Sequence, residues 1–222
     1  MKIFYSFILF LFLIARKIFS QNNAAQVFNI DSLPVHGILL DKGWKFQTGD
    51  NPDYAKPDYD DSKWQDINPT LDVHDLPQIK QGIVWFRLHL LLDSNLLKEQ
   101  LALIMEQSGA SEIYVNGILI HRFGIFDTDP AKVKAYDPLG LPIGFPLNKD
   151  GYQTLAIRYV LQPGLKYTNI FATQNYAANI SINNIVAASQ KYGRKNASVD
   201  GQNLFILGIF LMLAVLHLSL LQ

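Results

Sequence analysis

A ten-residue alternation is the feature that most constrains the fold of this chain. In "GIVWFRLHLLLDS" every second side chain is apolar, which is the period of a β-strand with one buried face. The set expected to face the core is Val84, Phe86, Leu88, Leu90 and Leu92. The opposite set is mixed, so we expect it on a partly exposed face or in a cleft; it comprises Ile83, Trp85, Arg87, His89 and Leu91.

Other segments of the chain have the same β character. Leu101–Gln107 and residues 152–163 are predicted strands, and weaker candidates surround Trp44 and Ile182. Gly, Pro, Asn and Asp residues mark turns between them, and no long helical pattern appears between residues 22 and 186. The stretches 94–100 and 129–136 each predict one or two helical turns. Many short strands with regularly spaced turns indicate an all-β, antiparallel sandwich or barrel.

The stretch "SEIYVNGILIHRFG" predicts a β-hairpin. Asn116-Gly117 supplies the two positive-φ residues that a type I′ turn requires. The resulting register pairs Val115 with Ile118 and Ile113 with Ile120 on a core face. The same register places two further pairs on a half-exposed face, and these are Tyr114 with Leu119 and Glu112 with His121.

Both ends of the chain are strongly apolar. Residues 1–20 have the length of a signal peptide, and Arg16 and Lys17 keep an uncleaved anchor open as the alternative. Residues 204–221 carry no charge and are apolar all round, which predicts a transmembrane helix rather than a core helix. We expect linkers at 21–35 and 191–203 and one domain at 36–190. The predicted location of the chain is the inner (cytoplasmic) membrane, with the domain in the periplasm or outside the cell.

Composition excludes several kinds of site. The 222 residues contain 19 Lys and Arg against 19 Asp and Glu, so no basic stripe indicates a nucleic-acid partner. The chain has no cysteine, which excludes disulfides, thiolate metal sites and a cysteine nucleophile. None of the five histidines has the spacing of a zinc site, and phosphate, dinucleotide and serine-hydrolase motifs are missing from the sequence.

A run of carboxylates in "DNPDYAKPDYDDSKW" has two interpretations. Asp50, Asp53, Asp60 and Asp61 are weak candidates for a structural calcium ion, bound through oxygen ligands. The alternative is a solvated loop whose Asp and Ser side chains cap turns. No other metal or cofactor is expected.

Aromatic and arginine side chains also have two interpretations. The tryptophans at 44, 64 and 85, with the tyrosines at 54, 59 and 136, form either sugar-stacking platforms or core. Arg87 and Arg158 lie in the middle of apolar runs, where each is either an ion-paired structural residue or a clamp for a ligand.

Four segments, in order, carry a family resemblance over residues 43–163. The sequence has "DSKW" at 61–64, Gly82 followed by "WFR" at 85–87, "VNG" at 115–117, and "LAIR" at 155–158. This ordered set resembles the galactose-binding-like jelly-roll domain, the N-terminal sugar-binding domain of glycoside hydrolase family 2. The resemblance implies a jelly-roll sandwich without catalysis, since in those hydrolases the active site lies in a separate barrel.

The same domain is similar to ectodomains of Bacteroidetes-type membrane sensors, including seven-transmembrane receptors with diverse intracellular signalling modules and sensor histidine kinases. This similarity implies a sensor ectodomain, truncated or split before its output module, that binds a carbohydrate or another small polar ligand. The alternatives are a tethered interaction or scaffold module and an accessory domain of a glycosidase. A homodimer or a downstream signalling protein is the expected partner. The predicted ligand-binding residues are Trp85, Arg87, Tyr114, His121, Tyr136 and Arg158.

Overall fold

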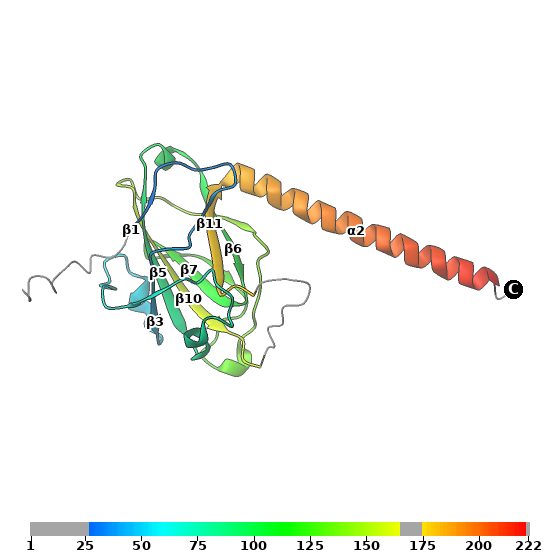
Figure 1. Ribbon diagram of the computed structural model, residues 1–222, viewed down its shortest axis with the longest axis horizontal. Coiled ribbons are helices and arrows are strands. Elements are labelled where there is room, and N and C mark those ends of the chain that lie inside the picture. The colour runs from blue at the N-terminus through cyan, green and yellow to red at the C-terminus, as the bar shows by residue number, and fades with distance from the viewer. Residues whose placement is uncertain (1–26, 165–174, 221–222) are drawn as a thin grey trace, which may run out of the picture.

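The computed structural model describes residues 27–164 and 175–220 (Figure 1). At positions 214–216 and 218–220 it describes the backbone alone. The predicted signal segment 1–20 lies outside the described residues. Within them, two sheets and one long helix account for most of the regular structure.

The larger sheet has seven strands and the smaller has four. The larger sheet runs β4 (Gln65–Ile67), β3 (Trp44–Thr48), β5 (Val84–Leu92), β10 (Tyr152–Leu161), β7 (Gly109–Val115) and β8 (Ile118–Phe123). β1 (Val27–Ile30) pairs with the second half of β5, on the same side of β5 as β3, which pairs with the first half. The smaller sheet runs β2 (Ile38–Leu39), β11 (Ala178–Asn184), β6 (Leu101–Gln107) and β9 (Pro142–Gly144). All of these pairs are antiparallel except β1–β5, which is parallel.

One apolar core joins the two sheets. The predicted inward side chains of β5 are all buried, at 0–3% exposure, which confirms the alternation. They share a hydrophobic cluster with Leu103 and Met105 of β6 and with Ile180 and Ile182 of β11. Aliphatic side chains from both sheets are therefore removed from water together, which is the main stabilising term of such a sandwich.

Short helical turns occur at both predicted places. η3 (Leu96–Lys98) falls within 94–100 and η4 (Pro130–Lys132) within 129–136. Two more turns, η1 (Pro52–Ala55) and η2 (Pro77–Lys80), begin at prolines, whose fixed φ suits the first helical position.

The hairpin between β7 and β8 confirms the turn and corrects the register. Asn116 and Gly117 have φ values of 52° and 80°, as a type I′ turn requires. Val115 pairs with Ile118 as predicted, but a bulge then shifts the strand so that Ile113 pairs with His121. The predicted pairing of Ile113 with Ile120 is therefore wrong, because the extra residue in β8 moves each later side chain by one position. Ile118 also is not in the core, since 57% of it is exposed.

The C-terminal helix α2 (Ile185–Leu220) begins directly after β11 and projects away from both sheets (Figure 1). Residues 191–203, predicted to be a linker, belong to this continuous helix. Within the described part of the chain, α2 is the one helix that is long and apolar enough to cross a membrane. The side chains of Leu204–Leu213 are all exposed, so no part of the sandwich covers them.

Gly109 gives a test of how tightly the strands approach. A Cβ atom there would lie 2.5 Å from the Val160 carbonyl oxygen and 2.6 Å from the Tyr159 ring. We predict that Gly109→Ala lowers the free energy of unfolding by about 1–3 kcal/mol, because the added methyl overpacks the site. Urea unfolding of the detergent-purified chain measures this change. Gly201→Ala is the control, since nothing lies within 4 Å of that position; equal effects of the two changes would contradict the packing.

Candidate functional site

The outer face of β5 is closed rather than exposed. Trp85 and Arg87 are both 0% exposed. Residues 50–64, which follow β3 and contain η1, lie over this face and contact both side chains. The expectation of a partly exposed face is therefore wrong at these two positions, and a ligand in solvent does not reach them directly.

Arg87 holds the covering segment in place. Its Nε donates a hydrogen bond of 2.8 Å to Asp61 Oδ2, and one terminal nitrogen donates to the Lys56 carbonyl at 3.0 Å and to the Tyr54 carbonyl. The other terminal nitrogen donates to the Tyr59 carbonyl at 3.4 Å. A single guanidinium thus binds a carboxylate and three backbone oxygens of one segment, which is a use of its planar set of donors.

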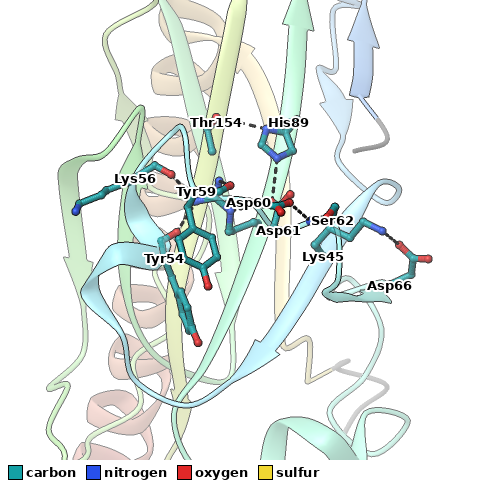
Figure 2. Close-up of polar contacts among 11 residues, drawn as sticks. Lys45, Tyr54, Lys56, Tyr59, Asp60, Asp61, Ser62, Asp66, His89 and Thr154 are labelled. Carbon is teal, nitrogen blue, oxygen red and sulfur yellow. Dashed lines mark hydrogen bonds and ion pairs between the residues drawn. The ribbon is translucent and has the colours of Figure 1, made fainter. Parts of the chain in front are cut away.

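Asp61 links this arginine to a histidine. His89 Nε2 lies 2.9 Å from Asp61 Oδ2, and the His89 Nδ1 faces the Thr154 hydroxyl at 3.5 Å (Figure 2). Burial opposes ionisation of Asp61, but the hydrogen bonds from His89 and Arg87 outweigh it and hold the pKa of the carboxyl below its ordinary value. The carboxylate therefore stays charged and bound to both partners at neutral pH.

Aromatic rings fill the space between the segment and the sheet. Tyr54 lies edge-on to Trp64, with ring centroids 4.9 Å apart, and Trp85 lies 5.6 Å from Tyr114. Trp64 is 7% exposed. Trp44 is also buried, and its indole nitrogen donates to the Leu40 carbonyl. The three tryptophans are thus packing residues, as the core interpretation predicted, and no sugar-stacking platform is formed by them.

A second polar network lies on the outer face of β7 and β10. Glu112 accepts hydrogen bonds from Arg122 at 2.8 Å, from Tyr114 at 2.9 Å and from Arg158 at 3.0 Å. Arg158 also binds both carboxylate oxygens of Asp50. Burial opposes ionisation of Glu112, but these donors hold its pKa below the ordinary value. Burial and the bond to Glu112 raise the pKa of Tyr114 to about 12.

His121 and Tyr136 lie apart from these networks. Because of the bulge, His121 pairs with Ile113, which faces the core, and so lies on the opposite face from Tyr114. Its ring packs 4.4 Å from Phe123, and Tyr136 stacks on Phe123 at 6.1 Å. The prediction that Tyr114 and His121 lie on the same face of the hairpin is therefore wrong. The six predicted residues do not converge on one site, and their ligand-binding role stays a prediction.

The four candidate calcium ligands have other partners. Asp50 binds Arg158, Asp53 pairs with Lys56, and Asp61 binds Arg87 and His89. Asp60 accepts the Ser62 backbone N–H, which is a turn cap. Across 27–164 and 175–220, no three metal-binding side chains come together as a group.

A cavity lies where several strands of the larger sheet begin or end. It has a volume of about 920 Å³ and is lined by the residues after β3, His74, η2 with the residues that follow it, the loop that contains η4, and the end of β10. We call it the end pocket. Three of its lining residues, Gly49, Gly82 and Gly164, have φ values of 100°, 104° and 75°, which favour glycine. The sequence indicates turns at Gly49 and Gly164, but no pattern indicated that these turns and Gly82 meet.

Comparison with known proteins gives structural neighbours only. No protein-family model matches the chain, and no curated protein does. A β-glucuronidase of Bacteroides uniformis matches with a TM-score of 0.49 and 20% identity over 65% of this chain and 17% of its own. A glycosyl hydrolase family 2 member from Bacteroides cellulosilyticus matches at 0.44 and 21%, over 66% and 20% of the two chains. A Ruminococcus gnavus β-glucuronidase matches at 0.44 and 11%, over 65% and 28%.

This chain spans only about a fifth of the length of the first two neighbours. The second belongs to the hydrolase family whose sugar-binding domain the sequence resembles. Hydrolysis is a property of those longer proteins.

Removing Arg87 tests the structural role of the buried network. We predict that Arg87→Met lowers the free energy of unfolding by about 3–5 kcal/mol, because Asp61 loses its cationic partner while still buried. Arg122→Met is the matched control and costs about 0–1 kcal/mol, since Arg122 is an exposed partner of its carboxylate. Both are measured by urea unfolding. A cost for Arg87→Met no larger than the control would show that the network is not structural.

Tyr114 gives a test in alkaline solution. Its pKa is raised to about 12 in the folded chain, so the protonated hydroxyl contributes stability that is complete below the unfolded pKa of about 10. That contribution is lost as pH rises from there through the folded value. We predict that Tyr114→Phe removes this part of the alkaline loss of stability, measured as the difference in unfolding free energy between the two proteins at each pH. Parallel pH profiles would contradict it.

Proposed function

We propose that this chain is a membrane-tethered, non-catalytic binding module that holds its ligand in the end pocket. The observation that carries the proposal is the pocket itself. Its volume of about 920 Å³ falls in the range of small-molecule sites. The outer sheet face, by contrast, is closed over Trp85 and Arg87.

The pocket lies at the end of the sandwich that is remote from α2. β3 and β10 end there, and β5 begins there, because these strands are antiparallel neighbours. β6 reaches the same end, since only one residue separates it from β7, and β11 starts beside it. α2 leaves from the other end of β11. A helix that spans a membrane would thus present the pocket away from the lipid.

The pocket wall suggests the kind of ligand. Ile79, Ile83, Val133 and Val160 give an aliphatic lining, while Lys80, Asp127 and Gln162 add polar groups. Such a wall suits a carbohydrate or another small polar molecule with an apolar portion. No described Phe, Tyr or Trp side chain lines it, and His74 supplies a single imidazole ring, so a sugar would be held mainly by hydrogen bonds and aliphatic contacts rather than by stacking on a large ring.

A sensory role extends this proposal. α2 continues directly from β11, so a change in the sandwich reaches the helix without an intervening linker. The inner membrane as location, the exported position of the sandwich and a signalling output are parts of the proposal. These parts are supported by the length and apolar character of α2 and by the resemblance of the sequence to sensor ectodomains.

An interaction module is the second candidate. β8 is one of the two edge strands at the ends of the larger sheet, and Ile118 at its start is 57% exposed. An exposed apolar edge favours pairing with another protein.

Calorimetry distinguishes these candidates. We predict that the detergent-purified chain binds at least one member of a panel of glycans and small polar metabolites. Thr128→Trp, at the pocket wall, should weaken that binding about tenfold or more, which is about 1.4 kcal/mol. Lys149→Trp, in an exposed turn before β10, is the control and should leave affinity within about twofold.

Two outcomes would contradict the proposal. Binding that Thr128→Trp leaves unchanged would place the ligand elsewhere. Hydrolysis of nitrophenyl glycosides by the chain would contradict the non-catalytic role.

A further inference from the structure

Residues 127–144 connect the end pocket to α2. We call them the strap. The strap begins at the pocket, where Asp127, Thr128, Pro130 and Val133 are lining residues. It ends as β9, which lies against the start of α2: a Cβ atom on Gly144 would lie 3.1 Å from the Ile185 side chain. One continuous piece of backbone therefore contacts both places.

The strap is bound to the sandwich along its length. The Ala135 N–H donates to the side-chain oxygen of Gln162, another pocket residue, at 2.9 Å. The Tyr136 N–H donates to the Gly109 carbonyl at 3.0 Å, and the Gly140 N–H to the Met105 carbonyl at 3.2 Å. Because these bonds follow one another at short intervals, little of the strap between Ala135 and Gly140 is free loop.

Near α2 the strap contains a strained turn. Leu139 has a φ of 54°, a left-handed conformation that a leucine rarely adopts. Its N–H donates to Asp137 Oδ1 at 3.0 Å, and its carbonyl accepts a hydrogen bond from Lys195 Nζ of α2 at 3.3 Å. The surrounding contacts must offset this strain, so we expect the turn to change if the bond to Asp137 or the bond to Lys195 is lost.

α2 is seated on the sandwich by its first three turns. Ala188 is 7% exposed, whereas Ser189 beside it is exposed. Lys195, two turns further along, reaches the strap at Leu139. Beyond these turns the described side chains of α2 are exposed, so the contacts that position the helix come from the strap and the adjoining sheet edge.

We propose that the strap couples the end pocket to the seating of α2, so that the occupied and empty pocket favour different seatings of the helix. This inference rests on the proposed function of the pocket. Coupling between two places is reciprocal. Unseating α2 must therefore loosen the strap back to the pocket, even when no ligand is present.

Hydrogen exchange of the full chain in detergent micelles tests the coupling. Ala188→Glu places a charge in the buried contact under α2 and unseats the helix. We expect amide exchange at Gly140, Tyr136 and Ala135 to rise about fivefold or more, the lower end of typical coupling. The Gly49 amide, on the opposite pocket wall and bonded to the Ile83 carbonyl, should be unchanged. Ser189→Glu adds the same charge on the exposed side and should change none of these rates.

An increase confined to α2 and β9, with Tyr136 and Ala135 unchanged, would overturn the inference. If Ala188→Glu raises exchange everywhere, including at Gly49, Lys195→Ala replaces it as the test, because that change removes only the bond to Leu139. No rise at Gly140 and Tyr136 in Lys195→Ala would then overturn it. The experiment uses no ligand, so a failure here leaves binding at the pocket standing, and a failure of the calorimetry leaves these exchange results valid.

Discussion

The buried guanidinium of Arg87 is the interaction on which the arrangement of this molecule depends. It lies at the centre of β5, fully removed from solvent, and binds one carboxylate and three backbone carbonyls of residues 50–64. A buried cation is tolerated only when its donors are satisfied. The covering segment supplies those acceptors, and the tyrosine and tryptophan rings that pack with it exclude water from the same face. The buried charge of Arg87 thus depends on the covering segment for its acceptors, and the covering segment depends on Arg87 for its position.

Closure of that face is the reason that we propose the end pocket, and not the outer face of the sheet, as the ligand site. With residues 50–64 in place, their aromatic side chains pack with Trp85 and Tyr114 of the sheet to form a second, smaller core. Among the described residues the end pocket is open, and Asp50, where the covering segment begins, forms part of its wall while bound to Arg158. From the other wall the strap runs to β9 and α2. The proposed binding site, the strap and a helix able to span a membrane therefore follow one another along a single path.

The sequence predicted what depends on local periodicity and turn chemistry. Alternation identified the buried face of β5, and Asn116-Gly117 identified the hairpin turn. Prediction from the sequence failed where contacts between segments far apart in the chain determine the structure. The exposure of Trp85 depends on residues 50–64, and the position of His121 depends on a bulge that has no clear sequence signal. Residues 191–203 are polar, which suggested a linker, yet they continue a helix that starts at Ile185. The end pocket is built from five separate places in the chain, so no spacing rule could indicate it.

Nuclear magnetic resonance with small organic probes tests most directly whether the outer face is closed and the end pocket open. Isopropanol and glycerol are titrated into the labelled chain in micelles, and amide and indole shifts are followed. The predicted shifts cluster at Gly49, Gly82, Gln162 and Gly164, which line the pocket, while the Trp85 indole signal stays constant. Shifts at the Trp85 indole and through residues 54–64, with the pocket amides unchanged, would show that the outer face is the accessible site and would contradict the structural role of Arg87.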